Sequence, residues 1–376
     1  MKQGFSRFLS ADPGRLHFAA HSHHPWPDVS FEAHQRAWLD AAELMDDKWA
    51  RVFGEVMPSA RARIAEVIGL ESGDSITFAP NTHELLVRIF SCVEPPVRVL
   101  STDSEFHSFA RQSRRWEEEG LAIVDRVPVD PWDSFAERFT VEARAGVHDL
   151  IYLSQVFYDS GFVVPGIDRI VSSVSEQSTL VVIDGYHAFM AMPVDLGPIQ
   201  DRVFFLAGGY KYAMSGEGVC FLHCPPGYAP RPVDTGWYAG FGQLEAGVGD
   251  LIPYATDGSR FSGATFDPSG LYRMDAVLGW LQGQGVTPQV VSSHVKDLQR
   301  RFLDAGVAPG RLLPPDPLPR GNFLTFETDR AADICDALHQ RKVTTDYRRD
   351  RLRIGFGIYH DEVDVDRLLE ILEALI

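Results

Sequence analysis

The 376-residue sequence predicts an α/β protein, with a large domain built on a mostly parallel sheet and a smaller α+β domain after it. From about residue 75, short apolar runs alternate with amphipathic stretches, which is typical of parallel strands joined by helices. After about residue 265 the alternation gives way to consecutive helices and then a strand–helix–strand–helix series. We therefore expect an N-terminal arm and helix over 1–50, a large domain over 51–262 and a small domain over 263–376.

The first fifty residues predict a proline-punctuated arm that leads into a helix. Ser30 is a suitable N-cap for a helix that continues through Trp38 and Leu44, and a second helix is expected over residues 59–69. The arm contains His21, His23 and His24, but no cysteine or pair of carboxylates lies near them in the sequence. We expect these histidines to form a wall of an active-site entrance and not a metal site.

The remaining elements follow in order along the chain. In the large domain we expect strands over residues 75–80, 97–102, 121–129, 149–156, 179–184 and 202–209, and helices over 81–90, 106–120 and 167–177. In the small domain we expect helices over 272–285, 290–306, 334–343 and 362–376, and strands over 322–328 and 351–357.

Composition and charge exclude several classes of protein. The formal net charge of −17 argues against nucleic acid or an anionic membrane as the main partner, so any bound anion must be captured by a local site. The 4 cysteines are too few and too scattered for a disulfide framework or a zinc site. The N-terminus lacks a signal-peptide core, and no apolar run is long enough to span a membrane. We expect a cytoplasmic protein with reduced cysteines.

Polar residues that directly follow predicted strands point to a ligand site. Asp184, Ser154 and Lys211 all lie where strands end, and ligands of open parallel sheets bind at that edge. Asn81 and Thr82 open a helix, whose free N–H groups and dipole favour a phosphate. Because burying a lone charge costs several kcal/mol, Asp184 and Lys211 each require a partner.

Pyridoxal phosphate needs this set of groups. Its ring nitrogen stays protonated beside a buried anion such as Asp184, and its aldehyde reacts with a lysine such as Lys211. Its phosphate suits the helix start at Asn81 and Thr82. Its ring requires a flat neighbour, which Phe106 offers after the strand over residues 97–102. A nicotinamide-dependent Rossmann enzyme has little support, because no G-x-G-x-x-G follows the first predicted strand.

The order of these motifs along the chain resembles that of a known group of enzymes. "DGYHA" at Asp184 followed by "GGYKY" at Lys211 resembles fold type I pyridoxal-phosphate enzymes of the class V aminotransferase group. Within that group the chain most resembles kynureninase. The segments that carry this likeness are "LHFAAHSHHPWP", "EFHSF", "LSQVFYDSG" and "TGWYAG".

The resemblance implies roles for particular residues around the cofactor. Lys211 would be the Schiff-base lysine, Asp184 the partner of the ring nitrogen, and His187 a neighbour of the phenolic oxygen. Phe106 would stack on the ring, with His107 as the alternative. The remaining cofactor contacts implied are Asn81, Thr82, Ser154 and Tyr210, together with Thr265 of "RFSGAT", which would reach the phosphate of a neighbouring subunit and so implies a homodimer.

The resemblance also implies substrate contacts and a reaction. Arg353 of "RLRIGFG" would grip the substrate carboxylate, with Arg351 as its rival, and Trp237 would line an aryl pocket. The implied reaction is hydrolytic Cβ–Cγ cleavage of kynurenine or 3-hydroxykynurenine to an aryl acid and alanine. Two positions depart from kynureninases: Phe109 stands in place of an aspartate, and Ala264 or Thr265 in place of an asparagine.

Other reactions use nearly the same residues and stay open. A class V aminotransferase is the main alternative, and an epimerase is another. A cysteine desulfurase requires a mobile cysteine in the small domain, whereas Cys335 has the spacing of a helix core position with Ile334 and Leu338. An alternative of a different class is a non-catalytic binding protein that retains the fold.

Overall fold

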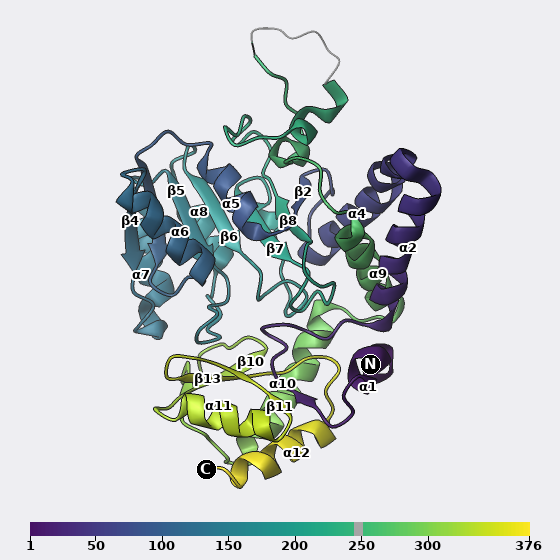
Figure 1. The fold of residues 1–376 in the computed structure, drawn as a ribbon. Helices are drawn as coiled ribbons and strands as arrows, with labels where there is room; N and C mark the ends of the chain where they lie inside the picture. Colours follow the sequence, from purple (N-terminus) through teal and green to yellow (C-terminus); the bar gives the residue numbers. More distant parts are fainter. Residues whose placement is uncertain (244–250) are drawn as a thin grey trace.

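The computed structural model describes residues 1–243 and 251–376 as two stacked α/β parts (Figure 1). The larger part is built on a 7-stranded sheet in the order β2-β8-β7-β6-β5-β3-β4. Its β8 is antiparallel to both neighbours, and the other adjacent strands run parallel. The strands are β2 (Ile76–Ala79), β3 (Val97–Thr102), β4 (Ala122–Val127), β5 (Leu150–Ser154), β6 (Leu180–Asp184), β7 (Val203–Gly208) and β8 (Cys220–His223).

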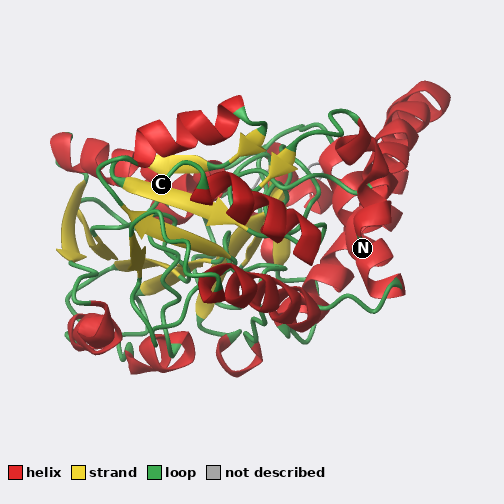
Figure 2. Ribbon diagram, turned by 90° about the horizontal axis from the view of Figure 1, so that it is seen from below, coloured by secondary structure: helices red, strands yellow, loops and turns green. Residues whose placement is uncertain are grey.

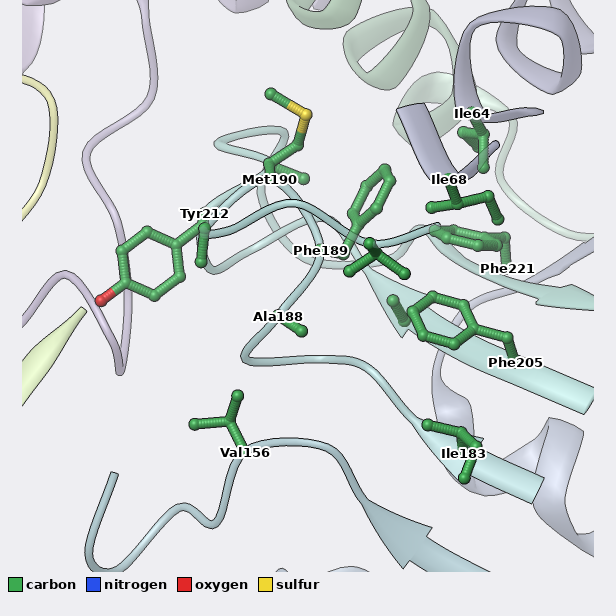
Figure 3. Packing of buried hydrophobic residues seen from close by; sticks show 14 of the residues in the cluster. Ile64, Ile68, Val156, Ile183, Ala188, Phe189, Met190, Phe205, Tyr212 and Phe221 are labelled. Carbon is green, nitrogen blue, oxygen red and sulfur yellow. The ribbon is translucent and has the colours of Figure 1, made fainter. Parts of the chain in front are cut away.

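The sheet is buried on both faces, which is why its strands are continuous apolar runs. Along β6, Val182 packs into the cluster on one face and Ile183 into the cluster on the other. The first cluster lies under α5 (Thr82–Phe90) and α6 (His107–Glu118). The second includes Ile183 with residues of α4 (Met57–Ile68), α7 (Trp132–Arg144) and α8 (Ile167–Ser173), and Figure 3 shows the part of it near Ile64 and Ile68. Helices therefore flank the strands on both sides (Figure 2).

The small domain contains a 4-stranded antiparallel sheet in the order β12-β13-β10-β9. Its strands are β9 (Arg311–Leu313), β10 (Phe323–Glu327), β12 (Asp346–Arg348) and β13 (Arg351–Gly355). The helices α10 (Pro288–Asp304), α11 (Ala331–Gln340) and α12 (Glu362–Glu373) share one hydrophobic cluster with it. Because β13 follows β12 after two residues, Asp346 and Arg353 become cross-strand partners.

The two ends of the chain meet in the small domain. The arm begins with η1 (Lys2–Phe5) and α1 (Ser6–Ser10), and its β1 (Leu16–His17) pairs in parallel with β11 (Val343–Thr344). Leu16 and Phe18 belong to the small-domain cluster, whereas α9 (Ser269–Gly283) packs with the large-sheet cluster beside α2 (Asp28–Leu44). The proposed boundaries at 50 and 262 remain a prediction.

Most of the elements expected from the sequence are present, and several others were not predicted. The helix for which Ser30 was the predicted N-cap begins at Asp28, with Pro27 in extended backbone as its N-cap. The Ser30 hydroxyl instead donates back to the Pro27 carbonyl at 2.7 Å. The sequence analysis missed α7, whose Phe135, Phe139 and Ala143 do show helical spacing, and the short strands β1, β8, β9, β11 and β12.

Three short helical segments lie between α2 and α4. They are η2 (Met45–Asp47), α3 (Lys48–Arg51) and the π-helical η3 (Val52–Val56). Three further 3-10 turns are η4 (Gly197–Ile199), η5 (Trp237–Gln243) and η6 (Gly258–Phe261). Within the described ranges, the helices are all too short or too polar to cross a membrane.

Candidate active site

The predicted residues that follow strands meet in one cavity at the carboxyl edge of the large sheet. Ser154 and Asp184 are register partners at the ends of β5 and β6, and Lys211 follows the end of β7. The cavity has a volume of about 440 Å³. The predicted site residues that line it are Asn81, Thr82, Phe106, Ser154, Asp184, His187, Tyr210 and Lys211.

Lys211 is buried and has a hydrogen-bond partner but no ion pair among the described residues. Its Nζ donates to His187 Nε2 at 2.8 Å, which leaves His187 Nδ1 buried without a partner. Burial lowers the pKa of Lys211 to about 7, although the Asp184 charge acts in the opposite direction. Burial, reinforced by the Lys211 charge, also holds the pKa of His187 well below its ordinary value. At neutral pH a substantial fraction of the Lys211 amine is therefore neutral, and it lies beside a neutral imidazole.

Asp184 is half-buried, and two donors fix its carboxylate. The Tyr152 hydroxyl donates to its Oδ2 at 2.7 Å, and the Tyr186 N–H donates to its Oδ1 at 2.9 Å. Burial raises the pKa of Asp184, against the effect of these hydrogen bonds. A cation bound in the cavity would reverse that shift, because an opposite charge favours the carboxylate. The carboxylate is thus suited to a protonated ring nitrogen.

The start of α5 forms another wall of the cavity. Asn81 caps the helix by accepting the Glu84 N–H at 3.0 Å and by donating to Glu84 Oε1 at 3.0 Å. The first N–H groups of a helix, here those of Thr82 and His83, have no intrahelical acceptor. Thr82 and His83 line the cavity, so this wall suits a phosphate.

Glu105 is a site residue that sequence reasoning missed. It lies buried behind Ser154, accepting the Ser154 N–H at 3.2 Å and the Thr102 hydroxyl at 3.0 Å, while Ser154 Oγ lies 2.5 Å from its other oxygen. Burial raises the pKa of Glu105 to about 8, with the Asp184 charge adding to the shift. The segment "EFHSF" was considered only for its aromatic residue, although an acidic residue beside a buried strand end was the available signal. Tyr186 was missed too, and its ring centre lies 4.5 Å from Lys211 Nζ.

The two candidates for the stacking residue lie in different places. Phe106 lines the cavity, with its ring centre 5.4 Å from Lys211 Nζ. His107 is exposed and does not line it, although both rings pack against Tyr158.

The predicted substrate residues lie outside this cavity in the single chain. Arg353 is buried next to it, where its Nε donates to Asp346 Oδ1 at 2.8 Å, a second bond joins Nη2 to Oδ2, and Nη1 donates to the Tyr158 carbonyl at 2.5 Å. Its positive charge helps to lower the pKa of Lys211, behind burial, so the two groups are near neighbours. The alternative substrate residue, Arg351, forms an ion pair with Asp159, in which Nη1 lies 2.5 Å from Oδ2.

Trp237 and Thr265 are further away. Trp237 is 44% exposed and packs on Tyr238 and Phe241, and Thr265 is exposed. The N-terminal arm does reach the site, because the His23 ring stacks on Tyr210 with centres 5.2 Å apart and the His24 N–H donates to the Tyr210 carbonyl. His21 lies deeper, with Nε2 at 2.9 Å from Asp346 Oδ1.

Fold and site together define a pyridoxal-phosphate enzyme of fold type I. A buried amine of low pKa shares the cavity with a carboxylate whose charge a bound cation would stabilise, and the Phe106 ring and the start of α5 complete the cavity walls. His187 Nδ1 and Gln155 Oε1 are buried and have no hydrogen-bond partner among the described residues. The chain belongs to the aminotransferase class-V family, which matches residues 42–305. The kynureninase C-terminal domain matches residues 298–372. Pyridoxal phosphate is accordingly the cofactor of this chain.

The individual relatives catalyse different reactions. Isopenicillin N epimerase from Streptomyces clavuligerus is 28% identical over 97% of this chain and 96% of its own. A cysteine desulfurase from Thermococcus onnurineus has a TM-score of 0.81 at 15% identity, covering 100% of this chain and 98% of its own. The cystine C–S lyase C-DES has a TM-score of 0.81 at 18% identity, covering 97% and 98%. These likenesses confirm the fold, and the family makes the chain an enzyme of the pyridoxal-phosphate-dependent class V type.

Proposed function

We propose that the enzyme cleaves the Cβ–Cγ bond of an aryl γ-keto amino acid by hydrolysis, as in kynurenine or 3-hydroxykynurenine. The observation that carries the proposal is the buried Lys211 amine, with a pKa of about 7, held by His187 in a cavity that also contains Asp184. Such an amine is neutral often enough at neutral pH to act as a base at a carbon acid. A match to the kynureninase C-terminal domain, which includes Arg353, favours this reaction over other class V reactions.

Most of the site residues would hold the cofactor, and Lys211 would also transfer the substrate proton. When bound, pyridoxal phosphate supplies an electron sink for the substrate carbon that loses its proton. Lys211 would hold the cofactor and then remove the Cα proton, and Asp184 would keep the ring nitrogen protonated. Phe106 would stack on the ring, and the start of α5 at Asn81 and Thr82, with Tyr210, would hold the phosphate.

The bond changes require only water beyond the substrate. The oxygen of water bonds to Cγ, the Cβ–Cγ bond breaks, one proton is delivered to Cβ, and Cα regains the proton that it lost. The products are an aryl carboxylic acid and alanine. His187 and Ser154 line the cavity and would keep the cofactor's oxygen substituents oriented.

The cysteines favour this reaction over desulfuration. Burial raises the pKa of Cys335, whose thiol donates to the Thr345 carbonyl at 3.7 Å within the small domain. Burial raises the pKa of Cys220, which lines the cavity, to about 12. A sulfur acceptor has to be an accessible thiolate, so neither residue suits that task.

Alanine release tests the proposal directly. The holoenzyme is incubated with kynurenine or 3-hydroxykynurenine, anthranilate-type fluorescence is followed, and alanine is measured by mass spectrometry. We expect equal amounts of both products and complete loss in Lys211→Ala. Absence of both products contradicts the proposal.

An epimerase is the second candidate, because isopenicillin N epimerase is similar along nearly the whole chain. The same incubations in D₂O distinguish the two reactions. Deuterium at Cα with inversion of configuration and no alanine would establish epimerisation, and amino transfer to a keto acid would establish an aminotransferase.

We also propose a homodimer in which Thr265 and Trp237 reach the neighbouring site, since both lie outside the cavity of their own chain. Mixing inactive Lys211→Ala chains with inactive Thr265→Val chains tests this arrangement. A shared site predicts partial recovery of activity in mixed dimers, and lack of recovery in mixed dimers contradicts it.

A further inference from the structure

A second cavity continues the active site outward. It has a volume of about 740 Å³ and lies between α6 of the large domain and the β12–β13 hairpin of the small domain. His83, Ser108 and Tyr158 line both cavities. His107 lies in the outer cavity, directly after Phe106 of the inner one. A substrate side chain that extends past Phe106 therefore enters this groove.

The groove is rich in arginine, in a chain with a net charge of −17. Arg111 and Arg114 lie on the exposed face of α6, and Arg349 lies in the opposite hairpin. Within the described ranges, none of these three makes an ion pair. A fourth lining arginine, Arg115, is already paired with Glu118 and Glu119.

The acidic residues of the groove do not cancel this charge. Glu118 is paired with Arg115, and Glu105 is the buried group described above. Asp103 remains, and its Oδ1 accepts the Val129 N–H at 3.0 Å and the Ser104 hydroxyl at 3.1 Å. The groove therefore contains three guanidinium groups that form no ion pair within the described ranges, and a single carboxylate that already accepts two hydrogen bonds.

The hairpin supports a role for the Arg349 side chain. Its backbone has a φ of 56°, in the left-handed region that favours glycine or asparagine in a two-residue hairpin. Arginine is therefore a costly residue for this turn. Nearby, the pKa of His107 is lowered by partial burial and by the charges of Arg348, Arg349 and Arg353, which indicates a positive potential at the rim.

We propose that this groove selects amino acids whose side chain ends in an anionic group, with Arg111, Arg114 and Arg349 as the residues that recognise it. For an aryl γ-keto substrate this means a ring with a carboxylate or other negative substituent. The inference rests on the proposed function only in placing the substrate Cα beside Lys211. Guanidinium groups suit the task, because they bind carboxylates through two parallel hydrogen bonds.

Binding measurements with matched amino acids test the proposal. The holoenzyme is titrated with L-2-aminoadipate and with L-norleucine, which differ only in the terminal carboxylate, and the change in cofactor absorbance gives each Kd. L-glutamate and L-glutamine form a second pair. We expect the anionic member to bind at least about tenfold tighter, as is typical of a charge-assisted hydrogen bond. We also expect this ratio to fall as salt rises from 50 to about 500 mM.

Variants assign the preference to the groove. Arg111→Gln with Arg114→Gln, and Arg349→Gln alone, should each reduce the ratio severalfold while the Kd of the neutral amino acid stays unchanged. Arg300→Gln is the matched control, since Arg300 is exposed on α10, far along the chain from the groove residues, and pairs with the exposed Asp297. Equal affinities in the wild type, or a ratio that none of the groove variants changes, would overturn the proposal.

The outcome is independent of the proposed reaction. A clear preference for the anionic amino acid without alanine release from kynurenine supports the groove and contradicts the hydrolysis. Alanine release without any preference supports the hydrolysis and contradicts the groove.

Discussion

Asp346 and Arg353 face each other across adjacent antiparallel strands, and the guanidinium of Arg353 donates two hydrogen bonds to the one carboxylate. A third bond joins Arg353 Nη1 to the Tyr158 carbonyl. An arginine has five N–H groups, so two remain for a substrate carboxylate. The ion pair therefore orients Arg353 without using all of its donors.

Removal of Asp346 should destabilise the protein and weaken substrate binding. In Asp346→Ala the buried guanidinium loses its counter-ion, and we expect the free energy of unfolding in urea to fall by roughly 3 kcal/mol. Burial alone would raise the pKa of Asp346, but His21 and Arg353 hold it well below the usual range. The stabilisation is therefore full above about pH 4 and is lost only in stronger acid.

A surface ion pair is the control for this experiment. Asp316→Ala removes the exposed partner of Arg320 and should cost less than about 1 kcal/mol. Equal effects of the two substitutions would show that the Asp346–Arg353 pair has no special role.

Replacing Lys211 should stabilise the cofactor-free protein in a pH-dependent way. The pKa of Lys211 is about 7 in the folded protein and near 10.5 when unfolded, so the folded state bears the cost of a buried charge below pH 7. The gain from Lys211→Met should be largest at or below pH 7 and shrink by about 1.4 kcal/mol per pH unit up to about pH 10. Urea unfolding at several pH values measures it, with exposed Lys296→Met as control. A gain independent of pH would rule out the lowered pKa.

The raised pKa of Glu105 should make the protein less stable as pH rises, which is the opposite of the effect of Lys211. Its folded pKa of about 8 lies above its ordinary value of 4.5, so the folded state binds the proton more tightly and loses stability as pH rises between these values. Glu105→Gln removes that dependence and should become increasingly more stable than the wild type from pH 5 to pH 8. Thermal unfolding at the two pH values measures the difference. For the exposed control Glu370→Gln, the difference in stability from the wild type should be the same at both pH values. If the difference for Glu105→Gln is also the same at both, the raised pKa of Glu105 is wrong.

Cofactor affinity should distinguish Phe106 from His107. Phe106→Ala removes a ring from the cavity and should raise the Kd of pyridoxal phosphate roughly fivefold, because an aromatic stack contributes about 1 kcal/mol. His107→Ala should leave it unchanged, since that side chain is exposed outside the cavity. Fluorescence titration of the cofactor-free variants measures both constants, and the reverse order of effects would make His107 the stacking residue.

Much of the fold and the centre of the site could be predicted from local sequence. Buried parallel strands are apolar runs, and Asp184 and Lys211 follow such runs, so the rule that ligands bind at strand ends brings them together. The resemblance added His187, which lies within hydrogen-bonding distance of Lys211.

Features that depend on tertiary contacts could not be read in this way. The partner of Arg353 lies on the three-residue strand β12, which is too short to show a period, and its role depends on register with β13. Glu105 is an ordinary acidic residue in sequence, and only its burial behind Ser154 makes it unusual. The predicted cap at Ser30 was wrong because Pro27 already has the extended backbone of an N-cap, three residues earlier.

The pairing of β1 with β11 has a consequence for biosynthesis. The arm that contributes His21 and His23 can dock only after the strand at Val343–Thr344 has left the ribosome. The parallel sheet can assemble earlier, with the arm still undocked. Ribosome-bound chains that stop before β11 should therefore expose the arm to protease, whereas chains that include β11 should protect it.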